Sequence, residues 1–449
     1  MKKVNNFLLW FIAGTSLFIL LFFGITISPT QAKDKPKPIS SRLTLKASNI
    51  VTYELYKNRI RVWGNDGDGE GYSNIWTAEE VNYRSIAIGD IDGDGQEEIV
   101  GLGVCERVYG KGKNREKEYE IFINVYKEGQ QGIWMTTYSD NENIIIEEKD
   151  TSYYEIVLND IDGDNLNEII LMTRTYLTIY KYDNDTGILK KIASRQLSKD
   201  IPFDKDVGSF GLKSVTAGDI DRDGQKEIIA AGDLISTENK GCIFICNLPD
   251  SDTELNLKNT IYVEYNFSKN SLRAGDLDRD GYMELCASVY NMSGSYPNYN
   301  YASYLLIWDY VQEAFACEEL ELEDDEPYLP WNPLDVGNLD NDPTRDEIAL
   351  VVGHSKQLLI YNWETSGFSN LYTIDLNPLT TIVDIAIGDS NSDGNNDINI
   401  AGNIYETIKR IRSSWIFYLA VYDVYGEQLW EQVDSDGEDV FDIAVDNKI

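Results

Sequence analysis

Short apolar segments rich in β-branched residues follow one another along most of the chain. The segment at 85–89 (SIAIG) is small and apolar, and the segment at 98–103 (EIVGLG) is almost wholly apolar. The segment at 121–127 (IFINVYK) mixes β-branched with aromatic side chains. Runs of this length separated by turn residues are typical of β-strands. A fourth, less regular segment follows, so the pattern predicts units of four strands.

The same order of segments recurs along the chain. Short small-residue strands are predicted in six units, at residues 85–89, 155–159, 214–218, 271–275, 333–337 and 384–388. The polar loops that follow them begin at residues 90, 160, 219, 276, 338 and 389, so the intervals run from 51 (338 to 389) to 70 (90 to 160). Such a period indicates a repeat protein. Four short strands in that length fit one blade of a β-propeller.

The two ends of the chain supply a further unit. Residues 441–447 (FDIAVDN) resemble residues 383–389 (VDIAIGD), which form a first strand. Residues 49–55, 60–66 and 73–80 have the character of second, third and fourth strands with no first strand before them. Pairing the ends would remove an exposed sheet edge. We therefore predict an all-β fold over residues 42–449, a seven-bladed β-propeller of four-stranded blades whose last blade is closed by N- and C-terminal strands.

An acidic loop follows the first strand in six units. The six loops read DIDGDGQEE (90–98), DIDGDNLNE (160–168), DIDRDGQKE (219–227), DLDRDGYME (276–284), NLDNDPTRDE (338–347) and DSNSDGNND (389–397). Positions 1, 3, 5 and 9 hold only Asp, Asn or Glu, which suits calcium because this hard cation takes six to eight oxygen ligands. Crowded carboxylates are unfavourable unless a cation neutralises them. An EF-hand would need a Glu at position 12 and flanking helices, whereas these loops run into strands.

The predicted calcium ligands are the side chains at positions 1, 3, 5 and 9 and the backbone carbonyl at position 7, for up to six ions. They are Asp90, Asp92, Asp94, Gln96, Glu98, Asp160, Asp162, Asp164, Leu166, Glu168, Asp219, Asp221, Asp223, Gln225, Glu227, Asp276, Asp278, Asp280, Tyr282, Glu284, Asn338, Asp340, Asp342, Thr344, Glu347, Asp389, Asn391, Asp393, Asn395 and Asp397.

The remaining loop positions have different roles. Position 2 is Ile or Leu in five loops and is expected to face the core, whereas position 4 varies as a solvated position would. Position 6 is Gly or Asn in five loops, residues that tolerate a left-handed backbone. The fifth loop instead carries Pro343 and one extra residue, so either Asp346 or Glu347 closes it. We expect the fifth site to be the weakest.

With these loops and strands, residues 42–449 resemble the FG-GAP/VCBS repeat family, the calcium-loop β-propellers related to the integrin α-subunit head. The resemblance implies that each loop joins the first and second strands of a blade on one face and that its oxygens hold calcium. It also implies that partners tend to bind the opposite face. The chain departs from the family pattern at Asn165, Pro343 and Asn391, and the Phe-Gly and Gly-Ala-Pro landmarks are degenerate.

The N-terminus has the features of an export signal. Lys2 and Lys3 precede an apolar run at residues 7–27, and Thr30 and Ala32 are spaced like a signal-peptidase site. Residues 1–32 are therefore predicted to be a signal peptide, and residues 33–41 a linker. The run is also long enough for an uncleaved anchor, the one route by which this chain would contact a membrane. Either form places the protein outside the cell, secreted or at its surface.

The charge of the chain excludes one class of partner and indicates another. There are 39 basic and 76 acidic residues, a formal net charge of −37, which argues against nucleic acid. Basic residues concentrate in hairpins between predicted second and third strands, at Arg107, Lys111, Lys113, Arg115, Lys117, Arg174, Lys240, Lys356, Lys409, Arg410 and Arg412. The hairpin at 291–301 (NMSGSYPNYNY) is rich in Tyr and Asn, as recognition loops often are. We expect this face to bind an anionic or glycan-bearing protein partner at the cell surface.

Catalytic residues are not predicted. His354 is the single histidine, so a Ser-His-Asp or Cys-His arrangement has no second imidazole to use. The five cysteines, Cys105, Cys242, Cys246, Cys286 and Cys317, are too few for a disulfide framework and are expected in the core. A recognition or adhesion module is the favoured function. An exported hydrolase, lyase or enzyme subunit on a propeller scaffold, and a structural envelope protein, stay open as alternatives.

Overall fold

The computed structural model describes the chain between residues 49 and 445. Its gaps are residues 55–58, 66–70, 79–82, 110–115, 130–131, 139–153, 202–208, 236–239, 250–252, 296–297, 312–313, 323–331, 341, 343, 353–356, 365–366, 377–379, 392, 409–411, 424 and 435–439. The predicted signal or anchor, the linker and His354 lie outside the described residues. Within them, the sole helix is a 3-10 turn, η1 (Leu197–Lys199).

The strands form seven antiparallel sheets of four. The first four sheets in chain order, counted from β4, consist of β4 (Tyr83–Gly89), β5 (Glu98–Tyr109), β6 (Glu116–Gly129) and β7 (Gly132–Tyr138); β8 (Glu155–Asn159), β9 (Glu168–Met172), β10 (Tyr176–Asp183) and β11 (Ile188–Gln196); β12 (Ser209–Gly218), β13 (Glu227–Ile235), β14 (Gly241–Asn247) and β15 (Asn256–Val263); and β16 (Asn266–Gly275), β17 (Glu284–Ser295), β18 (Asn298–Val311) and β19 (Ala314–Leu322).

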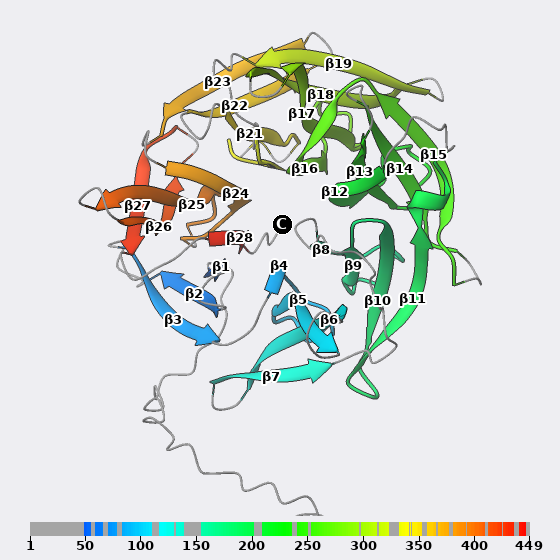
Figure 1. Cartoon of the computed structure of the whole chain (residues 1–449), viewed down its shortest axis with the longest axis vertical. Coiled ribbons are helices and arrows are strands. Elements are labelled where there is room, and N and C mark those ends of the chain that lie inside the picture. The colour runs from blue at the N-terminus through cyan, green and yellow to red at the C-terminus, as the bar shows by residue number, and fades with distance from the viewer. Residues whose placement is uncertain are drawn as a thin grey trace, which may run out of the picture. The chain divides into compact units, whose positions relative to one another are not determined.

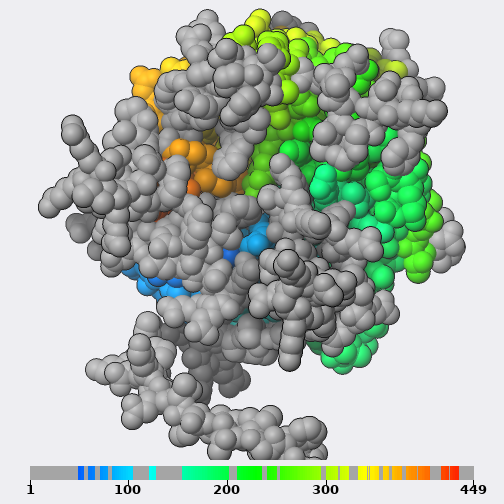
Figure 2. All heavy atoms as spheres, in the orientation of Figure 1, coloured from blue at the N-terminus to red at the C-terminus, as the bar shows by residue number. Residues whose placement is uncertain are grey.

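The other three sheets complete the ring. They consist of β20 (Leu334–Gly337), β21 (Glu347–Val352), β22 (Gln357–Glu364) and β23 (Gly367–Asp375); β24 (Thr380–Gly388), β25 (Asp397–Ile408), β26 (Arg412–Tyr422) and β27 (Gln428–Asp434); and β28 (Val440–Val445), β1 (Asn49–Glu54), β2 (Arg59–Asn65) and β3 (Tyr72–Ala78). The sheets are numbered here as blades 1 to 7 in this order. Figure 1 shows them arranged in a ring with first strands such as β4, β24 and β28 nearest its centre, and Figure 2 shows the same colour order in the atoms. The predicted seven-bladed propeller is confirmed.

Blade 7 combines the two ends of the propeller, as predicted. Strand β28 pairs antiparallel with β1, with Ile50 opposite Val445 and Thr52 opposite Ile443. Strand β1 pairs on its other side with β2. Ile50, Val51 and Tyr53 are completely buried. The C-terminal strand therefore covers an edge that would otherwise be open.

The hydrophobic core is divided among the contacts between neighbouring blades. Seven clusters of buried side chains occur among the described residues, and each joins two adjacent blades. Phe210 and Phe244 of blade 3, for example, pack with Met172 and Leu177 of blade 2. Each such side chain contributes about 1.5–3 kcal/mol when fully buried. The fold is thus stabilised chiefly by face-to-face packing of the sheets.

Polar side chains join the innermost strands around the axis. An innermost strand has no sheet partner on one side, so its N–H groups there need other acceptors. The side chain of one blade provides the acceptor for the next: Ile156 N donates to Ser85 Oγ at 3.2 Å, Val215 N to Glu155 Oε2 at 2.9 Å, Leu272 N to Ser214 Oγ at 3.3 Å and Ile387 N to Asp335 Oδ2 at 2.8 Å. These bonds set the spacing of neighbouring blades near the axis.

Removal of β28 tests how far ring closure stabilises the fold. Deleting residues 440–449 should lower the free energy of unfolding by about 3 kcal/mol or more, because at least two side chains of β1 would be re-exposed. Urea denaturation followed by tryptophan fluorescence measures this change. Deletion of residues 33–41, in the predicted linker, is the control and should leave the urea midpoint unchanged. Equal midpoints for the two deletions would mean that closure contributes nothing.

Candidate metal centres

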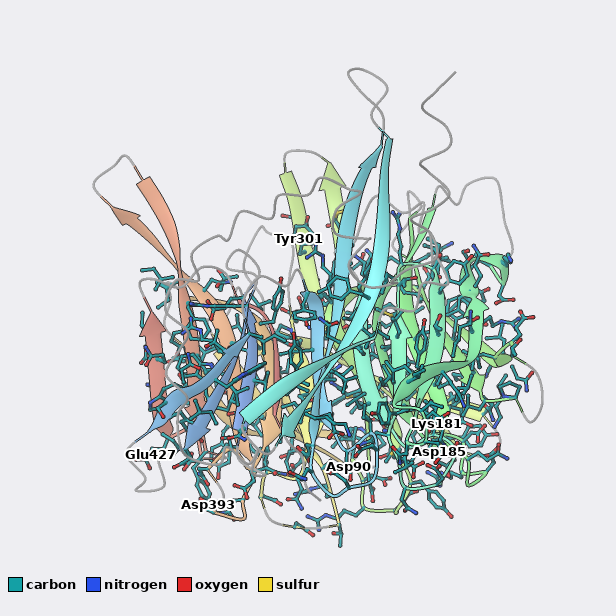
Figure 3. All side chains as sticks on the ribbon, turned by 90° about the horizontal axis from the view of Figure 1, so that it is seen from below. Asp90, Lys181, Asp185, Tyr301, Asp393 and Glu427 are labelled. Carbon is teal, nitrogen blue, oxygen red and sulfur yellow. The ribbon has the colours of Figure 1, made fainter. Side chains whose placement is uncertain are left out.

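The six acidic loops join the first and second strands of blades 1 to 6. Figure 3 shows Asp90 and Asp393, from two of these loops, at one end of the propeller and Tyr301, from the β17–β18 hairpin, toward the other. The strands of the hairpins on that opposite side are long, with 12 residues in β5, 12 in β17 and 12 in β25. The propeller therefore separates an acidic-loop face from a hairpin face.

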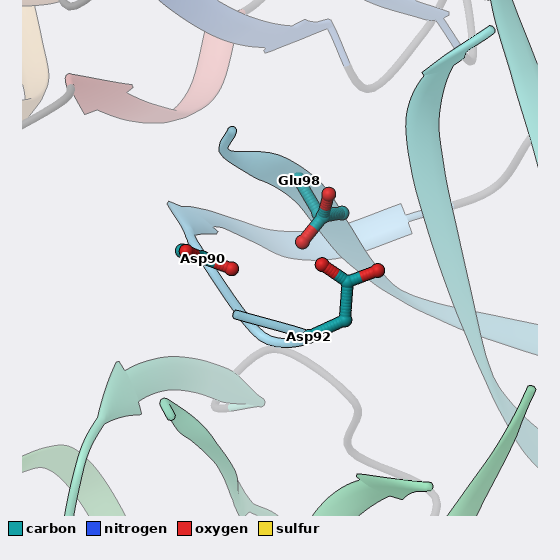
Figure 4. Close-up of side chains that lie close together, drawn as sticks. All are labelled: Asp90, Asp92 and Glu98. Atoms are coloured by element: carbon teal, nitrogen blue, oxygen red, sulfur yellow. The ribbon is translucent and has the colours of Figure 1, made fainter. Parts of the chain in front are cut away.

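The structure brings together the carboxylates at positions 1, 3 and 9 of the first four loops. In each loop these three groups offer oxygens that lie within 4.8 Å of one another, and Figure 4 shows the first set. The four sets are Asp90, Asp92 and Glu98; Asp160, Asp162 and Glu168; Asp219, Asp221 and Glu227; and Asp276, Asp278 and Glu284. The carboxylates at position 5 lie outside these groups. Each set has the composition of a calcium or similar hard-cation site.

Backbone N–H groups hold the loop carboxylates in place. In the first loop Asp90 accepts bonds from Gly93 N at 2.6 Å and Gly95 N at 2.9 Å, and Asp94 accepts one from Gln96 N at 2.8 Å. Glu98 accepts a bond from Ile91 N at 3.1 Å. The same position 9 to position 2 bond occurs for Glu168, Glu227, Glu284 and Glu347. The turn is therefore folded around its carboxylates.

The left-handed backbone predicted at position 6 is present, and a second one occurs at position 4. Position 6 has φ of 79° at Gly95, 66° at Asn165, 85° at Gly224, 83° at Gly281 and 90° at Gly394. Position 4 has φ of 75° at Gly93 and 77° at Gly163, but also 66° at Arg222 and 73° at Arg279. Arg222 contacts Asp280 of the next loop at 2.7 Å, and Arg279 contacts Asp342 at 2.8 Å. Position 4 is thus more than the solvated site expected from its variability.

Burial raises the pKa of the carboxyl groups that close the loops. Desolvation raises the pKa of Glu98 and of Glu284 to about 8, and the pKa of Glu227 and of Asp397 to about 7. Neighbouring loop aspartates raise these values further, while a backbone N–H lowers them. Glu284 is completely buried, and its Oε1 has no hydrogen-bond partner among the described residues. A bound cation would remove both penalties, so the residues present fit such an ion.

The fifth loop differs from the first four. Glu347 Oε2 accepts the N–H of Leu339 at 2.7 Å, the contact made by the ninth residue elsewhere, so Glu347 stands in the closing position. Asp346 instead turns to the previous loop, where its carboxylate accepts Asp276 N at 3.1 Å. The Arg345 guanidinium lies 3.2 Å from Asp340 and 3.1 Å from Glu347. A positive group thus lies between two of the predicted ligands; Pro343 is outside the described residues.

The sixth loop closes through different chemistry. Asp397 accepts a bond from Ser390 Oγ at 2.8 Å, and the amide of Asn391 donates to its other oxygen at 3.3 Å. Ser390 Oγ in turn accepts from the hydroxyl of Tyr72, in blade 7, at 2.8 Å. Asp389 accepts Gly394 N at 3.1 Å, and Asp393 accepts Asn395 N at 2.8 Å. The six loops are therefore not equivalent.

Three lysines are important neighbours that the sequence did not indicate. Lys127 of β6 contacts Asp92, Lys181 of β10 contacts Asp162, and Lys258 of β15 contacts Asp221. They lie on the third or fourth strand, well beyond the loop in sequence. Lys127 and Lys181 each directly follow a tyrosine of the third strand, in the strings VYK and IYK. This shared position is the sequence signal that would have identified these two lysines.

The four cysteines whose side chains are described are all free thiols. Cys242, Cys246 and Cys286 are buried free thiols, as expected, and burial raises the pKa of Cys246 to about 12. Cys317 is exposed, contrary to the expectation of a core position, because it lies on the outer strand β19. The side chain of Cys105 is outside the described residues.

A cavity of about 860 Å³ lies between the outer strands of blades 3 and 4. Its lining is mainly aromatic and aliphatic, with Tyr262, Tyr265, Trp308 and Phe315 among the aromatic side chains and Glu319 among the acidic ones. Asp221 and Lys258 connect it to the third loop. It lies at the rim, away from the central axis where a propeller enzyme would be expected to hold its active site.

Comparison with known proteins supports the fold and the repeat. Residues 160–230 match a family model described as an FG-GAP-like repeat, so the chain carries this repeat and the predicted resemblance is confirmed. The match runs from the second loop into β13. No curated protein matches the sequence. Within the described residues, no helical segment is long and apolar enough to cross a membrane.

Several solved structures are similar to the chain. They are a protein from Lactobacillus plantarum (12% identity, TM-score 0.51, covering 88% of this chain and 98% of that one), a functionally unknown protein from Desulfotomaculum acetoxidans DSM 771 (14%, 0.44, 89% and 99%) and the Nup133 β-propeller domain of Vanderwaltozyma polyspora (11%, 0.42, 80% and 90%). At 12% identity, the similarity to the Lactobacillus protein concerns the fold alone.

The raised pKa values predict how the metal-free protein responds to pH. A carboxyl group that binds its proton more tightly when folded favours the folded state below its ordinary pKa, and this contribution is lost as pH rises through the folded value. In EDTA, the free energy of unfolding should therefore fall between pH 5 and about 8, the folded pKa of Glu284. Urea denaturation at several pH values measures the slope. Glu284→Gln should flatten it, and an equal slope in the variant would contradict the assignment.

Proposed function

We propose that this protein is an exported calcium-binding β-propeller that serves as a recognition or adhesion module at the cell surface or in secreted form. The observation that carries the metal part is the fourth loop. There the buried Oε1 of Glu284 has no hydrogen-bond partner among the described residues, and carboxylate oxygens of Asp276 and Asp278 lie within 4.8 Å of that of Glu284. The ionised form of such a pocket is unfavourable unless a positive charge lies in it; without a cation, Glu284 takes up a proton, as its raised pKa indicates.

Calcium fits these loops better than other common metals. The donors at positions 1, 3, 5 and 9 are oxygens, and zinc sites in proteins favour cysteine and histidine. Magnesium demands near-ideal octahedral geometry, whereas calcium accepts six to eight ligands in a flexible turn. The predicted carbonyl ligand at position 7, for example that of Tyr282, would add to the side-chain set. Extracellular calcium modules bind at about 10⁻⁴ to 10⁻³ M, which agrees with the proposed export.

Recognition by the hairpin face is the second part of the proposal. The acidic loops lie on the other face, so metal binding leaves the hairpins free for a partner (Figure 3). Tyr301 belongs to the Tyr- and Asn-rich hairpin between β17 and β18. Most of the basic hairpin residues lie outside the described residues, and their role is inferred from sequence. We propose a protein or glycan partner, with anionic groups facing these hairpins.

An exported enzyme on this scaffold is the less favoured alternative. Near the axis Arg273 pairs with Asp335 at 2.8 Å and with Glu155 at 3.7 Å. Glu155 and Asp335 also accept backbone N–H groups of neighbouring blades. These groups have structural partners, which favours a stabilising role over catalysis. A structural protein of the envelope is compatible with the same features.

Glu284→Gln tests the metal part of the proposal. The variant should lose one calcium ion in isothermal titration calorimetry and should gain less thermal stability from calcium than the parent does, because a neutral amide is a weaker ligand. Asp185→Asn removes a carboxylate from an exposed turn on the same side (Figure 3) and should change neither quantity. If the parent protein neither binds calcium nor melts differently in EDTA, the metal part of the proposal is wrong.

Charge reversal tests the partner surface. Arg410→Glu together with Arg412→Glu should reduce binding to surface proteins or glycans captured from the native cells by at least about tenfold, because like charges would then face each other. The capture is quantified with and without calcium. Lys190→Glu, on β11, serves as the matched control and should bind normally. Unchanged capture by the double variant would exclude this face as the anionic-partner site.

A further inference from the structure

Strand register identifies one position of the third strand that lies beside every acidic loop. The residue after the closing carboxylate pairs with an aromatic or Cys residue: Ile99 with Tyr126, Ile169 with Tyr180, Ile228 with Cys246, Leu285 with Trp308, Ile348 with Tyr361 and Ile398 with Tyr422. The next residue along the third strand is Lys127, Lys181, Asn247, Asp309, Asn362 or Asp423. The same place in the fold is thus cationic in blades 1 and 2, neutral in blades 3 and 5, and anionic in blades 4 and 6.

In the first three blades a lysine reaches the carboxylates. Lys181 Nζ contacts Asp162 and lies 2.7 Å from Asp164 and 3.0 Å from Glu168. Lys127 Nζ contacts Asp92 and lies 3.8 Å from Glu98. In blade 3, where the third strand has Asn247, the cation comes from the fourth strand.

This third lysine makes the same contacts from a different strand. Lys258 Nζ contacts Asp221 and lies 2.7 Å from Asp223 and 3.2 Å from Glu227. Each of the three ammonium groups therefore touches members of the carboxylate set that would hold a metal ion. The recurrence of the contact from two different strands indicates that a positive charge is needed at this place.

The fourth loop lacks such a group. Asp309 stands at the third-strand position, and the Arg222 guanidinium of the third loop contacts Asp309 at 2.9 Å and Asp280 at 2.7 Å. Arg222 is also packed 4.5 Å from the ring centre of Tyr282. No lysine or arginine side chain among the described residues contacts Asp276, Asp278 or Glu284. The inner carboxylates of this loop have no counter-ion of their own.

We propose that Lys127, Lys181 and Lys258 are tethered counter-ions that compete with calcium in the first three loops, so that the fourth loop is the site of highest calcium affinity. This inference rests on the proposed metal-binding function and ranks the metal sites by their affinity for calcium. A divalent ion entering the second loop must displace an ammonium group or tolerate its repulsion a few ångströms away. In the fourth loop the one cation among the described residues that contacts a loop carboxylate is Arg222, which contacts the outer carboxylate of Asp280. An ion bound to the inner carboxylates therefore displaces no ammonium group.

Reciprocal substitutions test the proposal by calcium titration calorimetry. Lys181→Met removes the ammonium group and should strengthen one weak site by about tenfold or more, since the lost repulsion is of that order. Asp309→Lys should weaken the tightest site by a similar factor. Glu284→Gln identifies that tightest site. Lys190→Met, a lysine of the same blade paired with Asp183, is the control and should leave every site unchanged.

A second measurement does not depend on calcium. In EDTA, Lys181→Met should shift the urea midpoint to lower concentration than Lys190→Met does, because Glu168 loses its counter-ion. Circular dichroism verifies that each variant is folded. If Lys181→Met does not fold, the calcium affinity of Asp309→Lys tests the proposal instead.

The outcomes separate the two ideas. If the parent binds calcium and neither Lys181→Met nor Asp309→Lys changes any affinity, the competition is refuted while the metal-binding proposal survives. If the parent binds no calcium but Lys181→Met does, the metal-binding proposal for the natural chain fails and the counter-ion role is supported. If no variant binds calcium and Lys181→Met is as stable in EDTA as Lys190→Met, both ideas are refuted.

Discussion

The bond between the ninth and second residues of each loop connects the acidic sites to the hydrophobic core. Glu98, Glu168, Glu227, Glu284 and Glu347 accept the N–H of the residue at position 2. The side chain of that second residue is buried between its own blade and the next: Ile91, Ile161, Ile220, Leu277 and Leu339 each belong to a different inter-blade cluster. A cation that moves the closing carboxylate would therefore also move the residue at position 2, whose side chain packs between two blades.

The sixth loop shows that this connection can use other chemistry. Its second residue is Ser390, which bonds to Asp397 and to Tyr72 of blade 7 at 2.8 Å each. A hydrogen bond here replaces an apolar side chain at the interface with the blade that combines both ends of the ring. In chain order, this contact is the last of the links between an acidic loop and the following blade among the described residues.

Neighbouring loops also contact one another directly. Asn167 N donates to the carbonyl of Asp90 at 3.2 Å, and Asp346 N to that of Asp276 at 2.7 Å. The side-chain amide of Asn396 donates to the carbonyl of Asn338 at 2.8 Å. Each donor stands directly before the closing carboxylate, and each acceptor is the first residue of the preceding loop. Loops in contact through their ligand-bearing residues are expected to influence one another when one of them binds an ion.

Features with a fixed local spacing could be predicted from the sequence, whereas features that depend on sheet register could not. The blade number, the closing of the ring and the buried residue at position 2 follow from repeated strings of residues. The assignment of Glu347 over Asp346 required the structure, because one inserted residue makes both spacings possible. Lys127 lies 29 positions after Glu98 and meets it only because β5 and β6 pair in one particular register.

The charged residue that the third strand places beside an acidic loop explains why the loops differ in their need for a cation. In a chain with a formal charge of −37, a further anion is unfavourable, so the half-buried Asp309 beside four loop carboxylates is costly unless a positive group offsets it. Arg222 offsets the outer part of this charge and bridges two blades in doing so. The inner part, at the buried Glu284, has no such cation among the described residues, and this is the charge that the proposed calcium ion would offset. If the loops bind calcium as proposed, the covalently tethered cations would make the first three blades less dependent on calcium, and the interface of the fourth blade that includes Leu277 would depend on it most.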